Sequence, residues 1–192
     1  MLDKSLPYYN IIMKRLKGSD YPPVVLPQGY AFKAFEPGDA RVWSEIMVAV
    51  GEFDTMEEAS EYFETNYLPY PEALKSRAFF IVDTSGACVA TLTNWWNYTE
   101  EIREPSVHWV GVLPDYQGLG LGKAIVFEGM KRMIALEGDR DFYLHTQTWS
   151  YVAVSIYRKA GYRIVKDEVF GGYQNDYDLA SAVIKDKLGD VI

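Results

Sequence analysis

The sequence predicts an α/β fold, with a mixed, mainly antiparallel sheet and helices on both of its faces. One observation is a hairpin, because two alternating apolar runs flank the turn residues Ser85 and Gly86. Another is the order of the later segments, in which apolar runs of strand length alternate with longer amphipathic runs. Helices that lie between strands in the chain bury their apolar faces against the sheet.

Local signals define the individual elements. Pro37 marks one helix start, and Thr55 and Glu58 have the spacing of a capping box at another. Gly138 is placed to end the longest helix. Strands are expected at 29–35, 77–84, 87–96, 106–114 and 141–147, with a last strand pair at 162–169 and 171–180. Helices are expected at 37–51, 55–68, 121–138, 150–161 and 180–188.

The N-terminal residues have a different pattern. Residues 8–16, YYNIIMKRL, have a short helical pattern, and the prolines in 21–29 exclude a helix there. We therefore expect residues 1–28 to form an arm that packs on a single domain of residues 29–192.

The composition excludes several classes of protein. A net charge of −8 argues against a nucleic-acid partner, because phosphate binding needs clustered Lys and Arg. No apolar run reaches the roughly 18 residues of a membrane span. The N-terminus lacks the apolar region of a signal peptide, so we expect a cytoplasmic protein. Cys88 is the only cysteine and is expected to pack as a small apolar side chain.

The segment 110–124, VGVLPDYQGLGLGKA, has the composition of an anion-binding loop. A Walker A loop fails because Gln117 stands where its first glycine is needed and Ala124 where its hydroxyl is needed. A dinucleotide loop fails because Lys123 and Ile125 stand where its last glycine is needed. The pattern Q/R-x-x-G-x-G/A fits Gln117, Gly118, Leu119, Gly120, Leu121 and Gly122. Glycines there let backbone N–H groups at a helix start meet a diphosphate, with Lys123 at the rim.

This segment resembles the one that holds the CoA pyrophosphate in the GNAT superfamily of acyl-CoA-dependent N-acyltransferases. A second segment, TQTWSYVAVSIYRKAGY, is similar to the family pattern N-x-x-A-x-x-x-Y-x-x-x-G-F/Y. Ala153, Tyr157, Gly161 and Tyr162 fall on it, while Ser150 replaces the usual Asn. The resemblance covers about 100–163, and the element order suits the same fold from about residue 29.

The resemblance implies acetyl-CoA as cosubstrate and no metal. It also implies that the strand before the loop and the strand after the long helix splay apart to admit pantetheine. Backbone groups near Val110 and Val112 would then pair with the pantetheine amides. Tyr157 matches the tyrosine that protonates the leaving thiolate, although a tyrosine at this position can also be a core residue. Arg158 and Lys159 would either meet the 3′-phosphate or simply end the helix favourably.

The general base is left open. Many family members carry a glutamate where this chain has Ser106. Strand alternation puts Ser106, His108 and Val110 on one face, so His108 is a candidate base, or else a hydrogen-bonded strand residue. Glu104 shares that parity, but Pro105 makes its direction unreliable, and His145 is a weaker candidate.

The expected function is transfer of an acetyl group from acetyl-CoA to a primary amine by direct attack. The absent glutamate motivates an alternative, a catalytically idle acyl-CoA-binding or sensing module. Neither the acceptor nor the choice between monomer and homodimer follows from the sequence. Aromatic residues are candidate walls of the acceptor pocket, namely Trp95, Trp96 and Tyr98, with Tyr67 and Tyr70 beside them.

Overall fold

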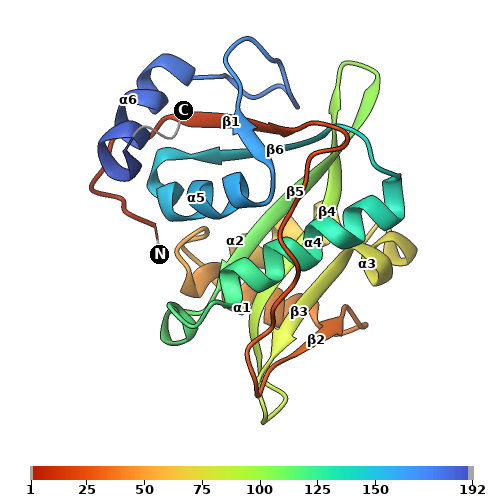
Figure 1. Cartoon of the computed structure of the whole chain (residues 1–192). Coiled ribbons are helices and arrows are strands. Elements are labelled where there is room, and N and C mark those ends of the chain that lie inside the picture. Colours follow the sequence, from red (N-terminus) through yellow and green to blue (C-terminus); the bar gives the residue numbers. More distant parts are fainter. Residues whose placement is uncertain (1, 190–192) are drawn as a thin grey trace. The chain divides into compact units, whose positions relative to one another are not determined.

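The computed structural model describes residues 2–189, and these form seven strands and six α-helices (Figure 1). The strands are β1 (Asn10–Arg15), β2 (Ala31–Ala34), β3 (Ala78–Val82), β4 (Cys88–Thr99), β5 (Ile102–Val112), β6 (Phe142–Gln147) and β7 (Tyr162–Ile164). The helices are α1 (Ala40–Ala49), α2 (Met56–Asn66), α3 (Pro71–Arg77), α4 (Leu121–Glu137), α5 (Tyr151–Lys159) and α6 (Tyr177–Leu188). The hydrogen-bonded strand order is β2-β3-β4-β5-β6-β1-β7.

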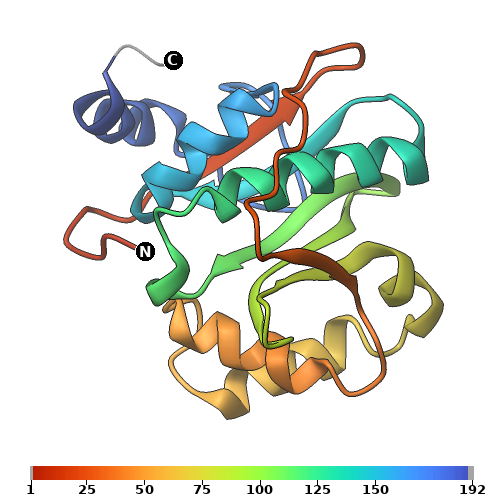
Figure 2. The same cartoon turned by 60° about the horizontal axis from the view of Figure 1, so that its bottom comes forward.

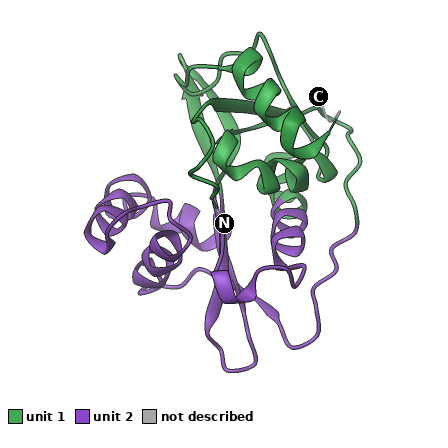
Figure 3. Ribbon diagram, turned by 90° about the vertical axis from the view of Figure 1, so that its left-hand side faces the viewer, with its two compact units in different colours: residues 1–22, 94–108, 130–192 green, residues 23–93, 109–129 purple. Residues whose placement is uncertain are grey.

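The chain divides into two compact units, which are described separately (Figure 3). Unit 1 comprises residues 1–22, 94–108 and 130–192, and unit 2 comprises 23–93 and 109–129. The strands β4 and β5 pass through both units. The β1–β6, β1–β7, β2–β3 and β3–β4 pairs are antiparallel, whereas β5 and β6 are parallel, with Ser106 opposite Tyr143. The predicted mixed, mainly antiparallel sheet is confirmed.

In unit 1, residues that we expected to form a helix form the strand β1 instead. The strand β1 lies between β6 and β7, and Ile11, Ile12 and Met13 are all fully buried. A strand buried on both faces shows no alternation, so a short apolar run such as residues 11–13 cannot be told from a helix by its pattern. The helices α5 and α6 lie next to each other and contact β7 and β1, respectively (Figure 2).

The prediction of a C-terminal strand pair is also wrong. Only Tyr162–Ile164 form a strand, and this strand pairs with β1. Residues 165–176, which we call the C-terminal loop, contain an isolated bridge between Phe170 and Tyr173. The predicted closing helix is present as α6.

In unit 2, the predicted capping box is present at the start of α2. The Thr55 hydroxyl accepts from the Glu58 N–H, and the Glu58 carboxylate accepts from the Thr55 N–H, each at 3.2 Å. The helix α2 buries Ala59 and Phe63 and packs against α1. The predicted β3–β4 hairpin is present, whereas the short helix α3 was not expected. Helices lie to either side of the strands of this unit (Figure 3).

Two smaller expectations can be compared with the structure. Burial raises the pKa of the Cys88 thiol, so the thiol stays protonated and uncharged. This is consistent with the expected role of Cys88 as a small apolar side chain. Among residues 2–189, no helix has both the length and the apolar character to cross a membrane.

Candidate functional site

The glycine-rich loop of unit 2 lies between the end of β5 and the start of α4. Gly118 has φ +79° and Gly120 φ +87°, a left-handed conformation that side chains disfavour. The first helical hydrogen bond runs from the Ala124 N–H to the Gly120 carbonyl at 3.1 Å. The N–H groups of the first turn therefore have no acceptor within the helix. Gly118, Leu119, Gly120 and Lys123 are exposed, and Gly122 is half-buried.

Side chains at the base of the loop tie it to neighbouring strands. The Gln117 side-chain amide donates to the Val112 carbonyl oxygen at 2.9 Å. The Tyr116 hydroxyl donates at 2.9 Å to Asp83, which also accepts from Ser85 in the β3–β4 turn. These contacts tie the base of the loop to β5 and to the β3–β4 turn, and no motif in the sequence indicates them.

The residue before the predicted pantetheine-binding backbone has an unusual conformation. Trp109 has φ +48°, which costs a bulky residue about 1–2 kcal/mol. Its ring packs 4.9 Å from Phe53, 5.1 Å from Tyr62 and 6.1 Å from Trp43, measured between ring centroids. The predicted alternation through His108 and Val110 is therefore interrupted at Trp109, because alternation requires extended backbone throughout.

The rest of this segment is held against α1. A Cβ atom at Gly111 would lie 2.6 Å from Met47 Cε and 3.0 Å from Ile46 Cγ2, so the strand and α1 are in close contact. Val110 and Val112 are half-buried on either side of Gly111.

In unit 1, His108 and His145 each hydrogen-bond an asparagine. Asn97 Nδ2 lies 3.1 Å from His108 Nε2, and His145 Nε2 lies 2.8 Å from Asn10 Oδ1. Burial and, to a smaller extent, the nearby His145 lower the pKa of His108 to about 3. Burial alone lowers the pKa of His145 to about 4. Both imidazoles are therefore neutral near pH 7.

Glu104, the other candidate base on β5, is hydrogen-bonded, and Ser106, at the position of the family's glutamate, is buried. The Thr99 hydroxyl donates to the Glu104 carboxylate. Ser106 is fully buried, and its hydroxyl has no hydrogen-bond partner among residues 2–189.

Tyr157 lies on α5 in unit 1 with 7% of its surface exposed. Its ring meets the Tyr162 ring edge-on, with centroids 6.3 Å apart. The Gln147 side chain caps the turn before α5 by accepting at 2.8 Å from the N–H of Ser150, the residue that replaces the family's Asn. Arg158 and Lys159 lie in the last turn of α5.

Two of the predicted pocket aromatics of unit 1, Trp95 and Trp96, form a stack. The Trp95 and Trp96 rings lie 4.2 Å apart and nearly parallel, and the Arg103 guanidinium covers Trp96 at 4.6 Å. Arg103 in turn makes a two-pronged ion pair with Glu137 at 2.8 and 3.0 Å. Tyr98 is exposed, and Tyr70 in unit 2 is also exposed, whereas Tyr67 is fully buried in the core of unit 2.

The protein is thus an α/β protein with an anion-binding type of loop. In this loop, left-handed glycines lead into the N-terminus of α4. Residues 43–162 match the model of the acetyltransferase (GNAT) family. This match covers more than half of the chain, so the chain belongs to that family. The predicted resemblance and fold are thereby confirmed.

The curated relatives are longer proteins. The chain is 29% identical over 172 residues to a mycothiol acetyltransferase of Actinosynnema mirum, which covers 83% of this chain and 52% of that protein. It is 28% identical over 139 residues to the mycothiol acetyltransferase of Streptomyces griseus subsp. griseus, with 72% and 44% covered. The chain thus spans about half the length of the curated relatives it matches.

Solved structures agree on the fold. A GCN5-related N-acetyltransferase from Sphaerobacter thermophilus superposes with a TM-score of 0.63 at 23% identity, covering 82% of this chain and 49% of that chain. A spermidine N-acetyltransferase from Vibrio cholerae, solved with CoA and spermine, gives a TM-score of 0.51 at 16% identity, with 70% and 81% covered.

Proposed function

We propose that the protein transfers an acetyl group from acetyl-CoA to a primary amine. Membership of the acetyltransferase (GNAT) family supports the reaction class. The observation that carries the choice of donor is the loop, where Gly118 and Gly120 are left-handed and exposed before the first turn of α4. A Cβ atom at Gly118 would meet nothing within 4 Å, so space is open there for a bulky anion.

The donor is held by backbone more than by side chains. In this proposal the N–H groups of Leu121, Gly122 and Lys123 bind the diphosphate, reinforced by the helix dipole. Lys123 adds a positive charge at the exposed rim. Val110 and Val112 supply backbone groups for pantetheine, with Gln117 holding the end of β5 to the loop.

The chemistry needs a neutral amine and a proton for the leaving sulfur. The amine nitrogen attacks the thioester carbonyl, so a C–N bond forms and the C–S bond breaks. Tyr157 donates its hydroxyl proton to the departing thiolate, and a neutral imidazole accepts the proton that the nitrogen loses. His108 is the residue that the sequence predicts for this second role.

The acceptor class is a small amine or a peptide amine. Relatives are described as mycothiol and spermidine acetyltransferases, whose names indicate different acceptors. The sequence predicts that the acceptor pocket is lined by Trp95, Trp96 and Tyr98. Of these, Tyr98 is exposed, whereas Trp96 is covered by Trp95 and Arg103. Among residues 2–189 no cluster of His, Cys, Asp or Glu could hold a metal ion. A cytoplasmic location, no nucleic-acid or membrane partner, and a monomer or homodimer remain predictions.

Two measurements test the proposal. Acetyl-CoA titrated calorimetrically into the purified chain should bind, and ATP and NAD should not displace it. A panel of polyamines, amino-sugar derivatives, amino acids and peptides should then release free CoA thiol. No acetyl-CoA binding up to millimolar concentration contradicts the proposal. Binding without thiol release from any amine favours the idle acyl-CoA-binding module.

A further inference from the structure

A row of polar side chains crosses four adjacent strands within unit 1. Asn10 faces Gln147 in the β1–β6 register, so His145 is its diagonal neighbour on the same face. Ser106 lies opposite Tyr143 in the parallel β5–β6 pair, which brings His108 and His145, each two residues further on, next to each other. In strand order from β4 to β1, the row consists of Asn97, His108, His145 and Asn10.

The two imidazoles have opposite tautomers. His108 Nε2 faces the Asn97 side-chain N–H, so Nε2 accepts and the ring proton lies on Nδ1. His145 Nε2 faces the Asn10 carbonyl oxygen, so Nε2 donates and the Nδ1 lone pair is left.

This difference decides which ring accepts a proton without loss of contacts. A proton added at His145 Nδ1 leaves the bond to Asn10 intact, because an imidazolium donates from both nitrogens. A proton added at His108 Nε2 would face the amide N–H of Asn97 and break that bond. The Tyr173 ring, stacked on His145 at 3.8 Å and nearly parallel, also favours a positive charge there.

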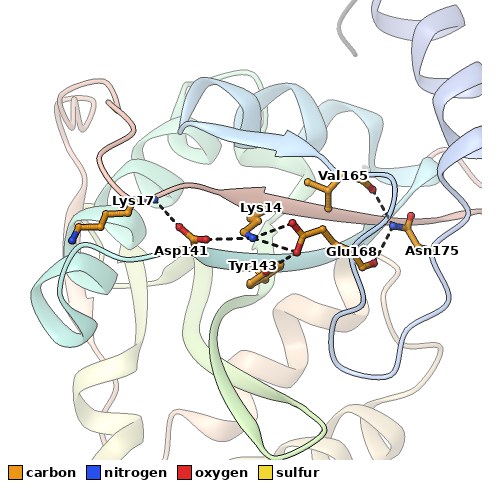
Figure 4. Close-up of polar contacts among 7 residues, drawn as sticks. All are labelled: Lys14, Lys17, Asp141, Tyr143, Val165, Glu168 and Asn175. Atoms are coloured by element: carbon orange, nitrogen blue, oxygen red, sulfur yellow. Dashed lines mark hydrogen bonds and ion pairs between the residues drawn. The ribbon is translucent and has the colours of Figure 1, made fainter.

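The C-terminal loop fixes Tyr173 in this position. Lys14 binds Glu168 at 3.0 Å, and the Tyr143 hydroxyl donates to the same carboxylate at 2.8 Å (Figure 4). The Asn175 side chain donates to the Val165 carbonyl at 2.9 Å (Figure 4). Between these anchors, the Gly171 N–H donates to the Thr99 hydroxyl at 3.0 Å. The stack on His145 is thus part of a held structure.

The geometry points to His145, rather than His108, as the catalytic residue that accepts the amine proton, with Asn10 as its positioning residue. This inference rests on the proposed amine acetylation. As the C–N bond forms and the C–S bond breaks, one proton moves from nitrogen to His145 Nδ1, directly or through one water. One proton moves from Tyr157 to sulfur. Exchange with water then restores both side chains.

The charged and titratable groups around His145 come from three sides. On β5 the group is His108, and on the C-terminal loop the groups are Tyr173 and Asp176, which accepts from the Asn10 N–H at 2.9 Å. Along β1 and β6, Lys14 is offset by Glu168 and Asp141. Each imidazole has an asparagine amide against its Nε2 atom, so a carboxylate introduced at one asparagine perturbs mainly the ring that this asparagine touches.

The test compares Asn10→Asp with Asn97→Asp in the full chain, using acetyl-CoA and the fastest amine of the panel. Asn10→Asp introduces a carboxylate against His145 Nε2–H and should raise the His145 pKa by about 1–3 units. Below that pKa His145 is protonated and accepts nothing, so kcat/KM should fall at a correspondingly higher pH than in the wild type. Asn97→Asp should raise the His108 pKa. It should leave the acid limb, the part of the pH profile in which kcat/KM falls at low pH, unchanged. Histidine NMR titrations measure both pKa values directly.

The outcomes separate this inference from the proposed function. The inference is supported if the wild type releases thiol and only Asn10→Asp moves the acid limb of the kcat/KM profile to higher pH. A limb moved by Asn97→Asp instead, or a raised His145 pKa with no movement, overturns it. If Asn10→Asp does not fold, kcat decides: His145→Gln should lower it by about 10²-fold or more, and by more than His108→Gln does. Absence of thiol release by the wild type with every amine overturns the proposed function itself.

Discussion

The Gln117 side-chain amide donates a 2.9 Å hydrogen bond to the carbonyl oxygen of Val112. The sequence predicts that both residues bind acyl-CoA through separate contacts. Gln117 belongs to the diphosphate loop, whereas Val112 supplies strand backbone for pantetheine. The bond joins them, so that the orientation of the glycine loop and that of the last strand residue are fixed together. We therefore propose that Gln117 contributes to acetyl-CoA binding by holding this backbone in place.

Replacing Gln117 with Ala should therefore weaken acetyl-CoA binding. Loss of one such hydrogen bond is worth about 1 kcal/mol, or about a fivefold higher dissociation constant. Titration calorimetry with acetyl-CoA measures it. Gln174→Ala is the matched control, because Gln174 also donates through its amide, to Asp176 in unit 1. Equal affinity of the Gln117 variant and the wild type would show that the bond has no role in binding.

Removing the Tyr157 hydroxyl should lower kcat by about 10²-fold or more while the KM for acetyl-CoA changes little, because the proton is needed only as sulfur leaves. Steady-state thiol release measures both constants. Tyr162→Phe is the control, since the buried Tyr162 hydroxyl has no partner among residues 2–189. That change should keep kcat and keep or increase stability. Similar kcat values for the two variants would exclude Tyr157 as the proton donor.

Gly161→Ala should be clearly more destabilising than Gly138→Ala. Both glycines have positive φ, +92° and +75°. A Cβ atom at Gly161 would also lie 3.0 Å from the Asp20 carbonyl oxygen, whereas one at Gly138 would meet nothing within 4 Å. We expect about 1 kcal/mol for Gly138→Ala and about 2–3 kcal/mol for Gly161→Ala from urea unfolding. Equal losses would mean that backbone conformation alone accounts for both.

The sequence predicts most elements between residues 29 and 161, because their signals are local. The Thr55–Glu58 capping box and the Ser85–Gly86 hairpin turn each depend on residues a few positions apart. The strand β1 does not, since its burial on both faces depends on β6 and β7, more than a hundred residues later in the chain.

The candidate site divides in the same way. The glycines of the loop are a local requirement for left-handed backbone, and the structure has Gly118 and Gly120 in that conformation. The left-handed Trp109 could not be predicted, because the rings of Phe53 and Tyr62 that pack against it come from distant segments. The Asn10–His145 bond joins residues 135 positions apart, which leaves no pattern in the sequence.

The network around Lys14 contributes to how stability depends on pH. Burial alone would lower the pKa of Lys14, but its contacts with Tyr143, Glu168 and Asp141 raise it above the ordinary value. The hydrogen bond from Tyr143, together with Lys14, lowers the pKa of Glu168. A raised lysine pKa stabilises below about pH 10.4, its unfolded value, and the gain is lost as pH rises through the folded value. A lowered glutamate pKa stabilises above about pH 4.3, and that gain is lost as pH falls through the folded value.

Urea unfolding from about pH 2 to about pH 12 should therefore show a plateau of stability between about pH 4.3 and about pH 10.4, with losses on both sides. Glu168→Gln should lower the plateau and flatten its acid side, because the variant removes the carboxylate that both Lys14 and Tyr143 contact. The matched control is Glu72→Gln, which removes one partner of the exposed pair with Lys75 and should leave plateau and acid side as in the wild type. An unchanged acid side in Glu168→Gln would show that Glu168 does not couple to folding.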